Sequence, residues 1–139
     1  MGHHHTVQEA MTPNPTAITP DTTAREAAQT LKTENIGSLP IVEDGRLVGV
    51  ITDRDLALRV IAEGRDANTP VGEIASKDLV TIDPQQSLEE AARLMAERQV
   101  RRLPVVEEDG RLAGVLAQAD IAQAGHDQLT GEVVQQISQ

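Results

Sequence analysis

The chain contains the same pattern twice, and this internal repeat limits its fold more than any other feature. Residues 36–56 (IGSLPIVEDGRLVGVITDRDL) return as residues 100–121 (VRRLPVVEEDGRLAGVLAQADI), and residues 19–28 return as residues 83–92. The offset is 64 residues at the start of the longer match (36 to 100) and 65 at its end (56 to 121). Solenoid repeats usually measure about 20–50 residues. The longer period predicts a tandem duplication, in which two copies of a small unit of helices and strands pack face to face.

Composition narrows the class of protein. A chain of 139 residues can bury a core, and that core must be aliphatic because the sequence has no Phe, Tyr or Trp. The absence of cysteine excludes disulfides, Cys-ligated zinc and thiol catalysis. A formal net charge of −10 and the missing aromatic rings argue against nucleic acid as a partner. No apolar run approaches the roughly 18 residues of a membrane span, so we expect no membrane association and a cytoplasmic protein.

The repeat also sets the expected division of the chain. The histidines after Met1-Gly2 resemble the remnant of a purification tag, with a native metal-binding tract as the alternative. The expected segments are a tag remnant (1–5), repeat one (6–63), a linker (64–70), repeat two (71–125) and a C-terminal tail (126–139) with a short helix near 130–137.

Helix and turn signals give the order of elements in each repeat. A Ser or Thr followed three residues later by Glu opens a helix, and an Asp-Gly dipeptide between apolar segments predicts a hairpin. The signals are Thr23/Glu26 and Ser87/Glu90 for the helices, and Asp44-Gly45 and Asp109-Gly110 for the hairpins. A short strand is expected before each helix (16–19 and 80–83), and a second helix after each hairpin (53–62 and 118–124). Each repeat is therefore predicted as strand, helix, strand, strand, helix, which is a mixed α+β fold.

The end of the return strand in repeat one has the chemistry of a binding site. A strand that ends at Ile51 and turns into a helix presents unpaired backbone N–H groups, which suit a phosphate. Thr52 can donate its hydroxyl to a phosphate oxygen, and Asp55 can accept hydrogen bonds from the vicinal hydroxyls of a ribose. Gly49 allows a neighbouring backbone to approach the strand closely. The alternative is that Thr52 and Asp55 only cap the helix, with no ligand present.

Repeat two keeps part of this pattern. Ala117 stands at the position of Thr52, whereas Asp120 matches Asp55. Alanine has no side-chain oxygen with which to cap a helix. An acid that served only the cap would have less reason to persist beside it, and we take this as support for a binding role.

The residues Gly49-Val-Ile-Thr52-Asp-Arg-Asp55, at the end of a β-α-β-β-α unit that occurs in tandem, resemble the CBS domain, named for cystathionine β-synthase. Gly114-Val-Leu-Ala117-Gln-Ala-Asp120 matches the same signature except at the hydroxyl. The resemblance covers about residues 7–125. The chain is similar to stand-alone bacterial CBS pairs of the hypoxic-response type. It implies two CBS repeats packed with pseudo-twofold symmetry into a Bateman module, which commonly forms homodimers. It also implies adenosyl ligands (AMP, ADP, ATP or S-adenosylmethionine) in the clefts between repeats.

The resemblance further implies which residues form each cleft. Each cleft would join the signature of one repeat to segments near the start of the other. The favoured cleft contains Val50, Thr52, Asp55, Val100, Arg101 and Arg102. The second contains Thr19, Ala24, Ile36, Gly37, Ser38, Val115 and Asp120. Only the first combines a hydroxyl, a carboxylate and guanidinium groups, so we expect a nucleotide there and an empty or less charged second cleft.

Arg101 and Arg102 also allow a simpler interpretation, in which they are a solvated pair beside Glu97 that contributes little to stability. Alternation along the strand would direct one of the two arginines into the cleft and the other away from it.

The sequence shows no catalytic constellation. His126, the histidine outside the tag, belongs to no recognisable dyad and is expected to interact with the last carbonyls of the second helix. The acidic residues show neither paired acid/base spacing nor a metal-ligand motif. We therefore expect a non-catalytic regulatory module that needs no cofactor beyond its regulatory ligand and acts on an unknown protein effector in trans. The alternatives are a structural or interaction stress protein with vestigial ligand sites, and a hydrolase or transferase acting on the bound nucleotide.

Overall fold

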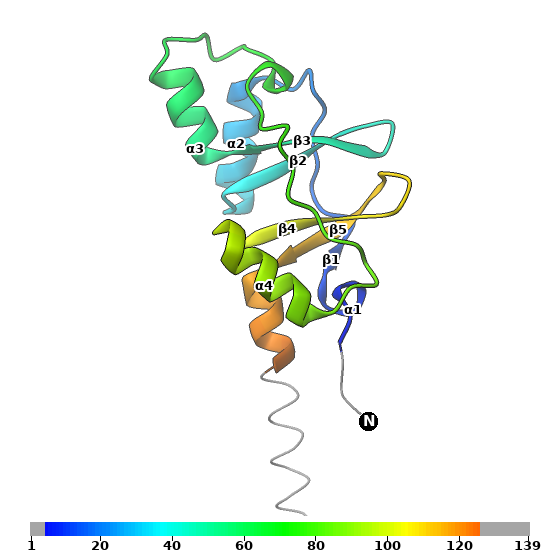
Figure 1. Ribbon diagram of the computed structural model, residues 1–139. Coiled ribbons are helices and arrows are strands. Elements are labelled where there is room, and N and C mark those ends of the chain that lie inside the picture. Colours follow the sequence, from blue (N-terminus) through cyan, green and yellow to red (C-terminus); the bar gives the residue numbers. More distant parts are fainter. Residues whose placement is uncertain (1–4, 126–139) are drawn as a thin grey trace, which may run out of the picture. The chain divides into compact units, whose positions relative to one another are not determined.

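A computed structural model describes residues 5–125 (Figure 1). His126 and the helix predicted at 130–137 therefore lie outside the described residues. The chain divides into two compact units, each built around one of the repeats. The repeat-one unit contains Thr16–Leu79 and Asp109–Leu112, and the described residues of the repeat-two unit are 5–15, Val80–Glu108 and 113–125.

The repeat-one unit is a two-stranded hairpin accompanied by helices (Figure 1). Its elements are α2 (Ala24–Glu34), β2 (Ser38–Glu43), β3 (Arg46–Thr52), α3 (Asp53–Asp55), η1 (Leu56–Ile61) and η2 (Val71–Glu73). The capping box predicted at Thr23 and Glu26 is present at the start of α2. The predicted hairpin turn is confirmed as well, with Asp44 and Gly45 at φ angles of 54° and 79°, the left-handed values that a tight turn between twisted strands requires.

The second helix of repeat one differs from its expected form. It begins as a short α-helical turn, α3, and continues as a π-helix, η1. The N–H of Ala62 accordingly donates to the carbonyl of Ala57, five residues earlier, at 2.9 Å. In repeat two the corresponding residues 118–125 are α-helical. The two copies of this helix therefore have different backbone geometries.

The repeat-two unit contains the other elements of the chain (Figure 1). They are α1 (Val7–Ala10), β1 (Thr12–Pro13), α4 (Leu88–Arg98), β4 (Arg102–Val106), β5 (Leu112–Ala117) and the helix at 118–125. The sheet has the order β1-β5-β4. Ser87 and Glu90 form the capping box predicted for α4.

The strands predicted at 16–19 and 80–83 are shorter than expected. Each is reduced to a single parallel bridge, Ile18 to Ile41 and Ile82 to Val105. In repeat one the chain turns at once, because Thr19 accepts the N–H of Thr22 in a tight turn. Ile18 therefore makes both of the backbone hydrogen bonds that join this segment to the hairpin, one to Pro40 and one from Val42.

The compact units cut across the boundaries expected from the repeat. The segment before repeat one packs in the repeat-two unit, where Thr12 of β1 pairs with Val115. The segment after the linker packs in the repeat-one unit, where Ser76 forms a bridge with Val50. Val7 and Val71 stand 64 residues apart and occupy equivalent positions with no exposed surface. Because the two valines are equivalent, the repeat pattern alone does not indicate in which unit each of their segments packs.

Two glycines make room for these two segments, which we call the leading segments: the one before repeat one, with Thr12, and the one after the linker, with Ser76. A Cβ atom on Gly49 would lie 3.3 Å from the carbonyl oxygen of Ser76, which confirms the close approach predicted there. At Gly114 a Cβ atom would lie 2.6 Å from the carbonyl oxygen of Thr12 and 2.7 Å from the sulfur of Met11. The approach is therefore tighter in repeat two than in repeat one.

Each unit has its own aliphatic core, as the composition predicts. In the repeat-one unit the core includes Leu39, Ile41, Ile51, Val71 and Ile74. In the repeat-two unit it includes Val7, Met95, Leu103, Val105 and Leu116. Within residues 5–125, none of the helices combines the length and apolar character needed to cross a membrane.

Candidate functional site

The turn from β3 into α3 is a closed capping box. The Oγ1 of Thr52 accepts the N–H of Asp55, and the Oδ2 of Asp55 accepts the N–H of Thr52, both at 3.0 Å. The capping interpretation of these residues is therefore correct as far as it goes. It does not exclude a ligand, because the hydroxyl of Thr52 can still donate and the second carboxylate oxygen of Asp55, Oδ1, is outside the box.

Backbone donors at this turn are less available than the sequence suggests. The N–H groups of Thr52 and Asp55 serve the capping box, and the N–H of Asp53 donates to the carbonyl of Gly37 at 3.0 Å. These three N–H groups are therefore not free for a phosphate, because the side chains of Asp55 and Thr52 and the carbonyl of Gly37 accept them. The turn still has one hydroxyl and one carboxylate oxygen for a ligand.

The hairpin brings several predicted site residues of repeat one together. Ser38 pairs with Thr52 in the antiparallel register, and Val50 pairs with Pro40. Ile36 packs partly buried against the core of the unit. Residues assigned from the sequence to two different clefts, Ser38 and Thr52, are thus direct neighbours across the strands.

Thr19 and Ala24, two further predicted site residues, have structural partners. The hydroxyl of Thr19 donates to Asp21, and this hydrogen bond lowers the pKa of the Asp21 carboxyl below its ordinary value. Ala24 is buried in the core, and its N–H donates to the carbonyl of Thr69 at 2.8 Å. Turn formation and packing account for both residues without a ligand.

The matching turn of repeat two keeps half of the capping box. The N–H of Ala117 donates to Oδ2 of Asp120 at 2.8 Å, although no hydroxyl is there to complete the reciprocal bond. Asp120 therefore has a structural reason to be present beside an alanine. This corrects the expectation that the acid would have little reason to persist without its hydroxyl partner.

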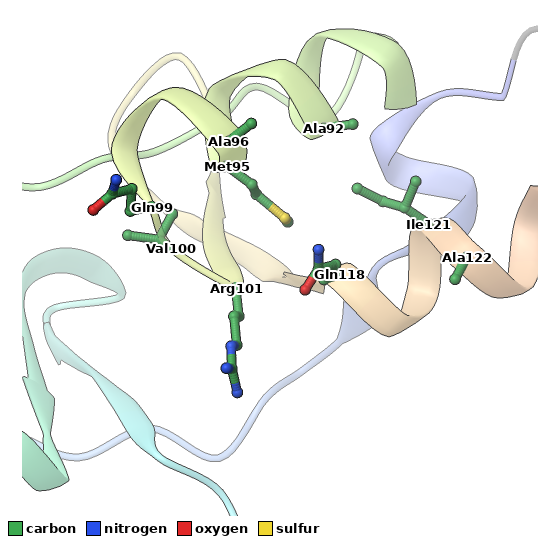
Figure 2. Close-up of a pocket in the computed structure, with 9 residues that line it drawn as sticks. All are labelled: Ala92, Met95, Ala96, Gln99, Val100, Arg101, Gln118, Ile121 and Ala122. Atoms are coloured by element: carbon green, nitrogen blue, oxygen red, sulfur yellow. The ribbon is translucent and has the colours of Figure 1, made fainter.

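Val100 and Arg101 line a pocket of about 500 Å³ in the repeat-two unit (Figure 2). Its walls come from α4 and the helix at 118–125, and Figure 2 shows Met95 and Gln118 pointing into the space between the two helices. The guanidinium of Arg101 extends away from α4 (Figure 2). The pocket is mostly apolar, and Arg101 supplies the charged group at its edge.

Both predicted arginines are exposed. Arg102 is the first residue of β4, and Arg101 precedes the strand, where its carbonyl accepts the N–H of Gln118 at 2.8 Å. In the described part of the chain, neither guanidinium forms an ion pair with Glu97 or with any other acid. Val115, the remaining predicted residue of this unit, is half-buried opposite Thr12.

Sequence reasoning missed Arg59. Its Nε lies 3.8 Å from Oδ1 of Asp55, and its Nη1 donates to the carbonyl of Ile74 at 3.0 Å. The available signal was the spacing of four residues between Asp55 and Arg59, which places opposite charges on one helix face.

The family profile of the CBS domain matches the chain twice, at residues 7–62 and 71–127. The chain belongs to the CBS-domain family. The resemblance stated from the repeat and its signature is confirmed, and so is the mixed fold of helices and small antiparallel sheets.

Similar CBS proteins match most of this chain. The CBS domain-containing protein YhcV of Bacillus subtilis is 47% identical over 116 residues, covering 84% of this chain and 82% of YhcV. Hypoxic response protein 1 of Mycobacterium tuberculosis is 40% identical over 119 residues, with the same coverage of 84% and 82%. The crystal structure of CBSX2 in complex with AMP has a TM-score of 0.78 and 32% identity, covering 88% of this chain and 97% of that one.

The part of this CBS pair that the structure describes contains no group of three or more His, Cys, Asp or Glu side chains that could hold a metal ion. Most of the charged residues predicted for the site lie in the two signature turns and just before and at the start of β4. The residues of each predicted cleft are divided between the two units.

Proposed function

We propose that this CBS pair is a regulatory module that binds an adenosine-containing ligand, with AMP, ADP, ATP and S-adenosylmethionine as the candidates. Membership of the family supports a ligand-binding role, and the AMP complex of CBSX2 supports the adenosyl class. The observation that carries the proposal is the turn at Thr52 and Asp55, which closes its own cap and still has a hydroxyl hydrogen and one carboxylate oxygen for a ligand.

The favoured site combines Thr52 and Asp55 with Val50 from repeat one and with Val100, Arg101 and Arg102 from repeat two. In this assignment Asp55 accepts from the ribose hydroxyls, since an ionised carboxylate is the stronger acceptor for such a pair. Arg101 and Arg102 are exposed and have no ion-pair partner among the described residues, which suits them to a phosphate.

The second site, with Val115 and Asp120 opposite Ile36, Gly37 and Ser38, is the weaker candidate. Ala117 provides no hydroxyl, and Gly37 and Ser38 stand where repeat two has its arginines. We expect this site to be empty or to bind a less charged adenosyl ligand.

The module would act in trans, in the cytoplasm, and without catalysis. Ligand binding would favour one packing of the two repeats over another and so change how a homodimer engages a protein effector. The second candidate function is a structural or interaction protein with vestigial sites. The half-box at Ala117 and Asp120 favours it, because this contact stabilises the turn with no ligand.

Calorimetric melting of the full chain in the presence of AMP, ADP, ATP or S-adenosylmethionine separates the two candidates. A ligand at about 100 times its Kd stabilises the folded protein by about 2.7 kcal/mol, which corresponds to several degrees for a chain of this size. We expect at least one of the four to raise the melting temperature and Asp55→Ala to abolish the shift. If none of them changes it, the structural alternative holds. Unchanged ATP after incubation is the result expected of a protein without catalysis.

A further inference from the structure

Arg59 connects the signature carboxylate to a second segment of the repeat-one unit. Its guanidinium lies 3.8 Å from Asp55 through Nε and donates to the carbonyl of Ile74 through Nη1 at 3.0 Å. Ile74 is only 2% exposed and belongs to the segment that follows the linker. Two residues further on, Ser76 exchanges two backbone hydrogen bonds with Val50 at 3.1 and 3.2 Å. Arg59 therefore ties Asp55 to a buried, hydrogen-bonded part of the fold.

The two oxygens of Asp55 have different partners. Oδ2 accepts the N–H of Thr52 and completes the capping box, while Oδ1 faces the guanidinium of Arg59. The Asp55 side chain is 14% exposed and that of Arg59 is 49% exposed. At 3.8 Å the pair is an ion pair without a short hydrogen bond, so Oδ1 keeps lone pairs for a hydroxyl donor. Rotation of the carboxylate would break the Thr52 contact and move Oδ1 away from the guanidinium.

Neighbouring cations do not replace Arg59 in this role. Arg65 pairs with Glu63 at 3.8 Å, and among the described residues Arg54 forms no ion pair with Asp55. Arg59 lies within η1, where the N–H of Ala62 donates five residues back to the carbonyl of Ala57 at 2.9 Å.

Repeat two provides a natural comparison without the arginine. Ala124 occupies the position four residues after Asp120, as Arg59 does after Asp55. The carboxylate of Asp120 still accepts the N–H of Ala117 through Oδ2. The bond from the backbone N–H to the acid is thus present in both repeats, whereas among the described residues an arginine faces the remaining oxygen only in repeat one.

We propose that Arg59 is a positioning residue for ribose recognition, which holds Oδ1 of Asp55 in the orientation that accepts the two ribose hydroxyls. This inference rests on the proposed function and adds to it a determinant of specificity. In this assignment, Asp55 and Arg59 of repeat one discriminate between ribose and 2′-deoxyribose. Asp120, which has no such arginine, discriminates less between the two sugars.

Titration calorimetry with AMP and 2′-deoxy-AMP tests the proposal on the full chain. A hydroxyl bonded to a charged group corresponds to roughly 10- to 100-fold in affinity, so the wild type should prefer AMP by about that factor. In Arg59→Ala this preference should fall to a few-fold, with most of the loss in AMP affinity. Arg59→Lys should recover part of it, because an ammonium can face Asp55 but lacks the planar fork that also reaches Ile74. Arg54→Ala is the matched control, which removes the same charge nearby, and should keep the preference.

The outcomes separate this inference from the proposed function. If the wild type binds neither nucleotide, the inference is wrong, and melting with ADP, ATP and S-adenosylmethionine then decides the proposed function. If Arg59→Ala weakens AMP and 2′-deoxy-AMP by equal factors, Arg59 is only structural or electrostatic and the inference is wrong, while the proposed function stands.

Hydrogen exchange in the absence of ligand gives an independent readout. Since Oδ2 of Asp55 accepts the N–H of Thr52, loss of positioning should speed exchange of the Thr52 amide in Arg59→Ala. The Ala117 amide, which donates to Asp120, should be unaffected and serves as the internal control. An unchanged Thr52 amide would overturn the positioning role whatever the affinities show.

Discussion

In both signature turns an aspartate accepts the backbone N–H of the residue three positions earlier, but the side chains around the aspartate differ. In repeat one, Thr52 and Asp55 exchange two hydrogen bonds. In repeat two, Asp120 accepts from Ala117 and receives no side-chain bond in return. The acid therefore stabilises its turn in both copies, and its presence alone does not identify a ligand site. The features that distinguish repeat one are the hydroxyl of Thr52 and the guanidinium of Arg59.

The same contrast extends to the segments that pack on each hairpin. The approach to Gly114 is closer than the approach to Gly49, so the two copies tolerate added volume differently. Several substitutions test how far the two halves differ.

The largest effect on stability is expected from Gly114→Ala compared with Gly49→Ala. The new methyl group at residue 114 would lie 2.6 Å from a backbone oxygen, so β1 or β5 must shift. Overpacking of this kind costs about 1–3 kcal/mol, and the 3.3 Å contact at residue 49 should cost less. Thermal melting followed by far-ultraviolet circular dichroism measures both. Equal melting temperatures for the two variants would contradict the asymmetry.

A smaller effect is expected from exchanging the capping residues. Thr52→Ala removes the acceptor for the Asp55 N–H and should cost about 1 kcal/mol, the usual value for a lost N-cap. Ala117→Thr should complete the second capping box and raise the melting temperature. Chemical denaturation of both variants provides the comparison. A destabilising Ala117→Thr would mean that the turn in repeat two cannot accommodate a reciprocal box.

The smallest effect is expected from the capping glutamates, which are fully exposed. Hydrogen bonds from the backbone and side chain of Thr23 lower the pKa of Glu26, and bonds from Gln86 and Ser87 lower that of Glu90, both from an ordinary value of 4.5. A lowered native pKa means that this contribution to stability is present above pH 4.5 and is lost as the pH falls through the native value.

Melting temperatures measured across acid pH test this prediction. Glu26→Gln and Glu90→Gln should each flatten the decline of the melting temperature below pH 4.5, and Glu97→Gln, which changes an exposed glutamate outside the capping boxes, is the control. An unaltered pH profile in both variants would show that the boxes do not depend on ionised glutamate.

The sequence predicted what local chemistry determines. Both capping boxes, the Asp-Gly hairpins and the aliphatic cores follow from residues close to one another in the chain. The segment with Val7 packs in the repeat-two unit, and the segment with Val71 packs in the repeat-one unit. This could not be predicted, because the two valines are equivalent in the repeat and suit either unit.

The site could be predicted only in part. The carboxylate of Asp55 and the hydroxyl of Thr52 were identified from the signature, but their reciprocal bonds removed backbone donors that the sequence had assigned to a phosphate. The bond from Arg59 to Ile74 depends on a π-helical turn and on a segment 15 residues away. Neither has a local sequence signal.

The most direct test of the central claim, that repeat one holds the ribose, compares Asp55→Asn with Asp120→Asn. In each variant the amide oxygen can keep the capping bond at the Oδ2 position, while the amide nitrogen replaces the other carboxylate oxygen. Titration of the full chain with AMP should show a roughly 10- to 100-fold weaker Kd for Asp55→Asn and little change for Asp120→Asn. Equal losses in both variants, or a loss confined to Asp120→Asn, would contradict the account.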